Sequence, residues 1–125
     1  MRRICVYGSL RKNEYNHNRM IDNYGEQSII YEKTVEIDGY NLYSLGSYPG
    51  VKHGDGKLTV DVLLVEDAVY SIIWNMEKNA NYSQVVVTVD DRNCIIFTYN
   101  GKVNEKNLVK SGNWSEHLKL QEQEV

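Results

Sequence analysis

The sequence predicts an α+β fold, a mixed sheet or small β-barrel with few flanking helices, in a single domain of residues 1–125. Three observations predict it. Short apolar runs recur along the chain, one segment alone has a clear helical period, and no repeat, low-complexity tract or Pro/Gly-rich linker divides it. A chain of 125 residues is long enough to bury about two-thirds of its extended surface in one core.

Strands are predicted where β-branched and aromatic residues form short runs, several in partial alternation with polar residues. These runs lie at residues 4–7, 28–37, 40–45, 58–65, 84–89 and 94–99. The segment Asp90-Asp91-Arg92-Asn93 separates the last two runs and predicts a hairpin turn. The stretch 46–56 contains several glycines and the only proline, so it is predicted to be a loop.

The clearest helix is predicted to begin at Asp67, a good N-cap residue. Its apolar residues Val69, Ile72, Ile73 and Met76 have the i, i+3, i+4, i+7 spacing of an amphipathic helix. Residues 11–18 are polar and predict an irregular loop, followed by a short helical turn at 19–23. Residues 115–125 predict either a short terminal helix or a frayed tail.

Composition argues against several classes of partner. The chain has 14 basic and 17 acidic residues, a net charge of -3, and no long block of either sign, which disfavours binding to nucleic acid or to an anionic membrane. No window approaches the ~20 apolar residues that span a bilayer, and the apolar run after Arg3 is too short for a secretory signal. We therefore expect a cytoplasmic protein whose partner is a small molecule.

The cysteines and histidines do not predict catalytic or metal chemistry. Cys5 and Cys94 both lie in apolar runs, which predicts buried free thiols, and neither has a histidine nearby in sequence. His17, His53 and His117 are scattered, without the spacing of metal ligands such as H-x-x-x-H.

Glu77 is the candidate general acid and base. It lies in the predicted last turn of the helix, where the negative end of the helix dipole disfavours a carboxylate. It also lies beside Ile73, at the border of the apolar stripe, where partial desolvation favours the protonated form. Both effects raise its pKa toward the neutral range in which proton transfer is efficient. The alternative is an ordinary solvated surface carboxylate.

The segment ICVYGSL at residues 4–10 raises a second possibility of a site. An apolar strand runs directly into Gly8 and Ser9, with Tyr7 at the junction. This is either an ordinary strand end followed by a turn, or a stretch of exposed backbone that holds a small ligand. Glycine permits close approach to the backbone, and successive N–H groups in such a turn can bind an anion.

Four stretches taken together resemble one known family. VYGSL, LYSLGSYPG, WNMEKNANYSQVVVTV and SGNW, in this order and spacing from Val6 to about Trp114, resemble the γ-glutamylcyclotransferase-like family, which includes AIG2-like and γ-glutamylamine cyclotransferase proteins. The resemblance implies a small barrel of mixed strands with helices around it, enclosing one pocket. It also implies a transferase or lyase activity that needs no metal or organic cofactor.

In this family the α-amino nitrogen of a γ-glutamyl compound attacks the γ-carbonyl of the same molecule, which releases 5-oxoproline and an amine. The resemblance gives Glu77 the role of base and acid in this reaction. It also implies that backbone N–H groups of Tyr7, Gly8, Ser9 and Leu10 bind the α-carboxylate of the substrate.

Further residues follow from the same resemblance. Tyr82 matches an aromatic residue that lines the pocket, Tyr48 precedes the Pro49 turn that shapes the pocket rim, and Asn16 orders the first loop or contacts the ligand. Trp114 is predicted to pack over one end of the barrel.

The sequence also departs from the family pattern. Val60 stands where the family usually has glycine, and Asn75 and Lys78 are unusual neighbours for the acid. A protein that keeps the pocket and binds a small molecule without turnover is therefore the alternative function.

Overall fold

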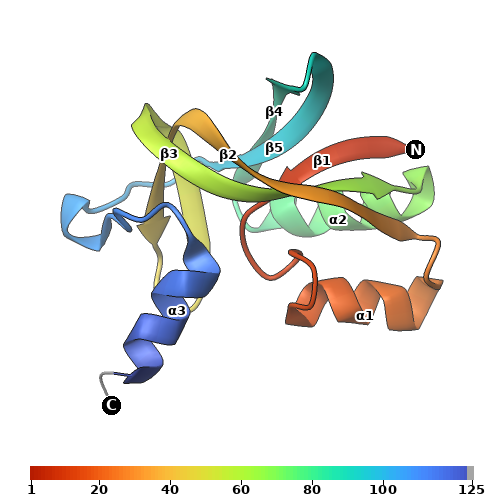
Figure 1. Cartoon of the computed structure of the whole chain (residues 1–125), viewed down its shortest axis with the longest axis horizontal. Coiled ribbons are helices and arrows are strands. Elements are labelled where there is room, and N and C mark those ends of the chain that lie inside the picture. The colour runs from red at the N-terminus through yellow and green to blue at the C-terminus, as the bar shows by residue number, and fades with distance from the viewer. Residues whose placement is uncertain (124–125) are drawn as a thin grey trace.

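The computed structural model describes residues 1–123, which form five strands, three α-helices and one short 3₁₀ helix. The elements are β1 (Arg2–Val6), α1 (Tyr15–Tyr24), β2 (Ile29–Ser44), β3 (Pro49–Val65), α2 (Asp67–Asn79), β4 (Tyr82–Val89), β5 (Arg92–Tyr99), η1 (Glu105–Asn107) and α3 (Trp114–Gln123). Figure 1 shows the strands above α1 and α2, with α3 set apart near the C-terminus.

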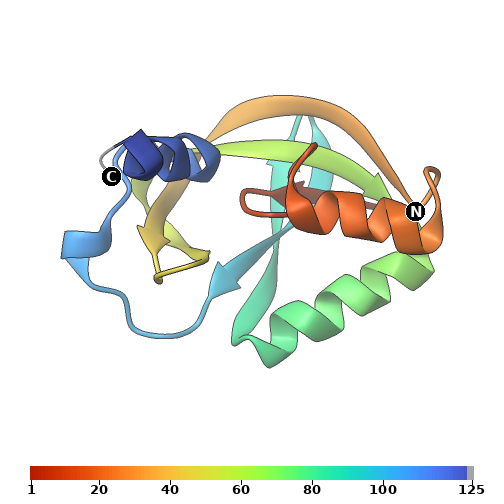
Figure 2. The same ribbon diagram turned by 90° about the horizontal axis from the view of Figure 1, so that it is seen from below.

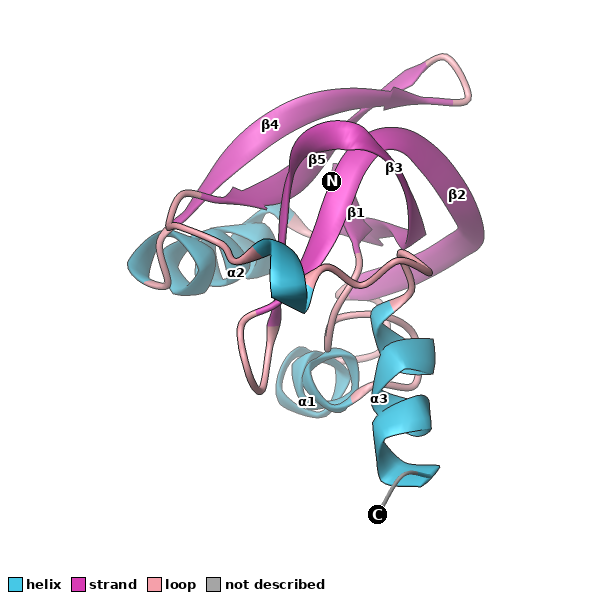
Figure 3. Ribbon diagram, turned by 90° about the vertical axis from the view of Figure 1, so that its left-hand side faces the viewer, coloured by secondary structure: helices cyan, strands magenta, loops and turns pink. Residues whose placement is uncertain are grey.

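The strands form one mixed sheet in the order β2-β3-β1-β5-β4. The central strand β1 pairs antiparallel with β3 and parallel with β5. The sheet curls strongly (Figure 3), but β2 and β4 remain as its two edges. The α+β class is therefore confirmed, whereas the word barrel describes this open sheet only loosely.

The longest hairpin, β2–β3, corrects two predictions. Residues 28–37 and 40–45, predicted as two strands, lie in one strand that has a register shift between Asp38 and Tyr40. The predicted loop 46–56 was wrong, because residues from Pro49 onward pair with β2 and only a short turn remains. Gly54 and Gly56 do not mark a turn: a Cβ at either position would collide with the Asn41 side chain.

The amphipathic helix α2 is confirmed, with a correction at its start. Its N-cap residue is Glu66, and Asp67 is the first helical residue. The carboxylate of Asp67 pairs instead with the N-terminal amino group of Met1, 3.4 Å away.

Helix α1 was predicted too short and too late in the chain. It begins at Tyr15, inside the predicted irregular loop, and has no side-chain cap of its own. The carbonyl oxygen of Ser9 accepts hydrogen bonds from the backbone N–H groups of Asn16 and His17, at 3.0 and 3.1 Å. These bonds satisfy N–H groups that the first turn of a helix leaves free, so the loop after β1 stabilises the helix start.

The sheet separates two apolar clusters. One includes Met20 of α1 and Ile73 of α2. These two helices lie on the same side of the sheet (Figure 2). The other includes Leu58 and Val60 of β3 and is covered by Trp114, confirmed as a packing residue that is 4% exposed. The predicted terminal helix is α3, while residues 124 and 125 lie outside the described part of the chain.

Two smaller expectations concern the cysteines and the membrane. Cys5 and Cys94 are both buried and free, as predicted. Across residues 1–123, every helix falls short of the length and hydropathy needed to cross a bilayer.

Candidate active site

One cavity of about 210 Å³ collects the residues singled out in the sequence. It lies where the end of β1, the loop after it, the last turns of α2 and the start of β4 meet. All eight predicted site residues line it: Tyr7, Gly8, Ser9, Leu10, Asn16, Tyr48, Glu77 and Tyr82. The fold therefore brings together side chains that are up to 75 positions apart in the sequence, from Tyr7 to Tyr82.

Glu77 enters the cavity from the C-terminal end of α2. Ile73, one turn earlier on the same helix, and Met76 line the cavity beside it. Burial raises the pKa of the Glu77 carboxyl from its ordinary value of 4.5 to about 7. The next residue, Lys78, is exposed and does not line the cavity. A carboxyl with this pKa is divided between its acid and base forms at neutral pH, so it can both accept and donate a proton.

The loop after β1 has its carbonyl groups occupied and its N–H groups free. Gly8 O accepts from Arg11 N at 3.1 Å, Ser9 O accepts from the start of α1, and Leu10 O accepts from His17 Nδ1 at 2.9 Å. Within residues 1–123, the N–H groups of Gly8, Ser9 and Leu10 donate to no protein acceptor. Because this loop also lines the cavity, its unpaired N–H groups form a candidate site for an anionic group.

Packing at Gly8 leaves little room for a side chain. A Cβ at Gly8 would lie 3.1 Å from Cγ of Pro49, closer than an ordinary van der Waals contact. The loop backbone is therefore packed directly on the proline ring at the start of β3. Pro49 also lines the cavity, so this contact fixes the loop relative to the start of β3.

Asn16 ties the start of α1 to the same loop. Its Nδ2 donates a hydrogen bond to Ser9 Oγ at 2.6 Å, and its side chain lines the cavity. Asn16 therefore lies where it can serve either role considered from the sequence: it holds the loop, and it borders the cavity.

Three tyrosines predicted from the sequence form part of the walls and the rim of the cavity. Tyr7 Oη donates to the carbonyl of Phe97 at 2.5 Å, and Tyr82 Oη donates to the carbonyl of Pro49. Burial and the nearby charge of Glu77 raise the pKa of both phenols, so both stay neutral. Tyr48 is 48% exposed and lies at the mouth. We infer that Tyr7 and Tyr82 shape the cavity, because their hydroxyl protons are already used.

Comparison with known proteins gives the family. Residues 4–116 match the family described as "Gamma-glutamyl cyclotransferase, AIG2-like". The chain belongs to this γ-glutamyl cyclotransferase, AIG2-like family. A Citrobacter rodentium relative, the "Gamma-glutamylcyclotransferase family protein ytfP", is 31% identical over 113 residues, which cover 90% of this chain and 94% of that protein.

Solved structures agree with this family assignment. The crystal structure of an uncharacterized protein from Pyrococcus horikoshii matches with a TM-score of 0.82 at 27% identity, covering 99% of this chain and 98% of that one. The solution structure of Escherichia coli YtfP matches with a TM-score of 0.73 at 27% identity, covering 92% and 97%. Both therefore share the fold of this γ-glutamyl cyclotransferase-like chain over nearly its whole length.

Sequence reasoning missed part of the cavity lining of this family member. Ile73 could have been found, since it precedes Glu77 by four residues and lies on the same helix face. Phe97 could not, because it lies on β5 in an apolar run that carries no local signal of a site.

Proposed function

We propose that this γ-glutamyl cyclotransferase-like protein releases 5-oxoproline and an amine from a small γ-glutamyl compound. One observation carries the proposal: a carboxyl with a pKa of about 7 and a row of unpaired backbone N–H groups line the same cavity. The N–H groups of Gly8, Ser9 and Leu10 bind the substrate α-carboxylate, which leaves the adjacent α-ammonium for Glu77.

Glu77 relays the protons of the reaction. The α-nitrogen arrives with three hydrogens and ends in the lactam ring with one, so it loses two. It attacks the γ-carbonyl carbon, a bond forms between them, and the bond from that carbon to the departing nitrogen breaks. The two protons end on the departing nitrogen, which leaves as an ammonium. Ring closure needs a folded substrate, so holding both ends of the glutamyl group supplies much of the acceleration.

The lining of the cavity favours one kind of leaving amine. The lining residues include Met76, Ala80 and Tyr48, and in the described chain none of them is basic. An amine that carries its own carboxylate would bury that charge without a cationic partner, which is costly. We therefore propose that the preferred substrates are γ-glutamyl compounds in which the group on the departing nitrogen is small and either uncharged or apolar.

The altered neighbours of the acid do not count against turnover. Asn75 and Lys78 are exposed on α2, away from the cavity lining, and Val60 is buried in the cluster on the other face of the sheet. All three departures from the family pattern therefore lie outside the residues that line the cavity around Glu77.

The test is release of 5-oxoproline from a panel of γ-glutamyl amines and γ-glutamyl amino acids. Glu77→Gln, which keeps the shape of the side chain, should lower kcat by about 10²- to 10⁴-fold. Asp67→Asn is the matched control, because Asp67 lies at the opposite end of α2 and is 75% exposed. Turnover that survives Glu77→Gln would remove Glu77 from this role. Ligands that raise the melting temperature without yielding product would support the binding protein instead.

A further inference from the structure

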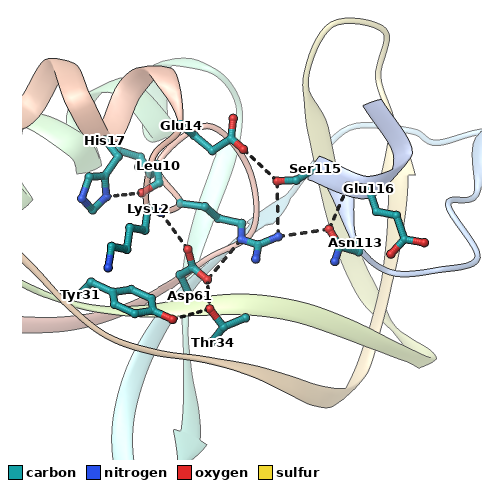
Figure 4. Close-up of polar contacts among 11 residues, drawn as sticks. Leu10, Lys12, Glu14, His17, Tyr31, Thr34, Asp61, Asn113, Ser115 and Glu116 are labelled. Carbon is teal, nitrogen blue, oxygen red and sulfur yellow. Dashed lines mark hydrogen bonds and ion pairs between the residues drawn. The ribbon is translucent and has the colours of Figure 1, made fainter. Parts of the chain in front are cut away.

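A buried carboxylate lies directly behind the loop that carries the free N–H groups. Asp61 of β3 is 2% exposed, although it lies in the apolar run of residues 58–65. Its Oδ2 accepts a hydrogen bond from Lys12 N at 2.8 Å, and its Oδ1 accepts one from Thr34 Oγ1 at 2.7 Å. Oδ1 also lies 3.3 Å from Nε of Arg11. Figure 4 shows these contacts converging on Asp61.

Arg11 extends the contacts to the C-terminal helix. Its guanidinium donates to Asn113 Oδ1 at 3.2 Å and to Ser115 Oγ at 3.4 Å (Figure 4). Ser115 in turn donates to Glu14 Oε1 at 3.2 Å. We call this set the Asp61–Arg11 network: Asp61, Arg11, Lys12 N–H, Thr34, Asn113, Ser115 and Glu14. The network joins the loop after β1 to β2, to β3 and to the start of α3.

Such a network holds a backbone in one arrangement. A buried carboxylate is stable only when its oxygens are paired, so moving the loop would take Arg11 and the Lys12 N–H away from the Asp61 charge. The network fixes Arg11 and Lys12 on one side of residues 8–10. On the other side, Asn16 and His17 of α1 fix the carbonyls of Ser9 and Leu10. The three free N–H groups therefore lie on a short segment that is held both by the network that follows it and by the start of α1.

We propose that Asp61 and Arg11 are positioning residues, which hold the N–H groups of Gly8, Ser9 and Leu10 in the orientation that binds the substrate α-carboxylate. Neither side chain lines the cavity, so neither touches the substrate. The kinetic part of this inference rests on the proposed function, whereas the part about loop order does not.

The kinetic test is Asp61→Asn, which keeps the side-chain shape and removes the charge. KM should rise about tenfold while kcat changes by less than about threefold, because ground-state binding is lost and Glu77 on α2 is not moved. The pH profile should keep its apparent pKa of about 7. Arg11→Gln should act in the same direction, and the double variant should not exceed the larger single effect, since both residues act through one contact.

The matched control is Glu32→Gln. Glu32 pairs with Arg3 at 3.2 Å, and the two side chains are 21% and 8% exposed, so this ion pair is also shielded from water. It links β1 to β2, the two strands on either side of β3, and lies outside the cavity lining. The control should lower stability and leave KM unchanged.

A second measurement needs no substrate. In the unliganded protein, the NMR order parameters of the Ser9 and Leu10 amides should fall from about 0.85 toward 0.6 in Asp61→Asn and stay constant in Glu32→Gln. If Asp61→Asn fails to fold, Thr34→Val removes one hydrogen bond to Asp61 at an exposed position and should lower the same order parameters by a smaller amount.

The outcomes separate the two proposals. A wild-type protein without turnover overturns the proposed function, while the amide measurement still decides the role of Asp61. Unchanged Ser9 and Leu10 amides in a folded variant overturn the positioning role, and so does an unchanged KM in an active enzyme.

Discussion

Pro49 stands between Gly8 and Tyr82: the Gly8 backbone packs on its ring, and its carbonyl oxygen accepts the hydrogen bond of the Tyr82 hydroxyl. The loop after β1, the start of β3 and the start of β4 are therefore joined in one continuous wall. The position of the Gly8 backbone relative to the Tyr82 ring is therefore set through this single proline.

Tyr82→Phe should cost stability and spare the chemistry. The variant loses the hydroxyl that donates to Pro49, so the free energy of unfolding should fall by about 1 kcal/mol in urea denaturation. kcat should change little, because the hydroxyl proton is committed to the backbone. Tyr99→Phe is a control, since the Tyr99 ring packs on Tyr82 with centroids 5.3 Å apart. A tenfold drop in kcat at unchanged stability would place the Tyr82 hydroxyl in the reaction.

Gly8→Ala should displace the loop from Pro49. The new Cβ would lie 3.1 Å from Pro49 Cγ, so either the loop or the proline must shift. We expect KM to rise several-fold and stability to fall by about 1 kcal/mol. The double variant Gly8→Ala/Pro49→Ala removes the clashing ring atoms and should recover part of the lost affinity. If the double variant recovers no affinity, Gly8 has a role other than this contact with Pro49.

Activity should rise with pH through the neutral range. The α-ammonium can lose its proton only to the ionised form of Glu77, whose pKa burial raises to about 7. Below that pH, kcat/KM should fall by about tenfold per pH unit. Measurement of kcat/KM between pH 5 and 9 tests this, and an acid limb centred near pH 4.5 would show that the reacting carboxyl is an ordinary exposed one.

Stability should move in the opposite direction. Between pH 4.5 and about 7 the folded protein holds a proton on Glu77 that the unfolded chain has lost, so the free energy of unfolding falls as pH rises through this window. Glu77→Gln removes this loss and should be more stable than the parent at pH 8 by up to about 3 kcal/mol. Urea denaturation of both proteins at pH 5 and pH 8 measures it. Equal pH dependence of the two proteins would contradict the burial of this carboxyl.

Local patterns predicted the elements whose stability is local. The period of Val69, Ile72, Ile73 and Met76 predicted α2, and the polar turn between two apolar runs predicted the β4–β5 hairpin. In that turn Asp90 and Asp91 both have positive φ, which matches the two-residue hairpin geometry.

The errors have causes that lie outside the segments concerned. The start of α1 depends on the Ser9 carbonyl, which lies outside the helix and gives no signal within it. Gly54 and Gly56 resemble turn residues in sequence, but they make room for Asn41 on the paired strand.

The candidate site was more predictable than the network behind it. Glu77 and the loop of residues 7–10 stand out by helix position and by family resemblance. Asp61 could have been singled out from the sequence, because it is a lone acid within a strand of apolar residues. A carboxylate buried in such a strand requires partners. Its partners Arg11 and Thr34 could not be named before the fold was known.

The two-sided sheet has a consequence for protein engineering. Trp114 and Val60 belong to the packing behind the sheet, whereas Ile73 and Met76 border the cavity in front. Heat resistance and substrate preference can therefore be selected in separate libraries, the first built around Val60 and Trp114 and the second around Ile73 and Met76. Gains from the two libraries should combine nearly additively, because Val60 and Trp114 belong to one apolar cluster and Ile73 belongs to the other.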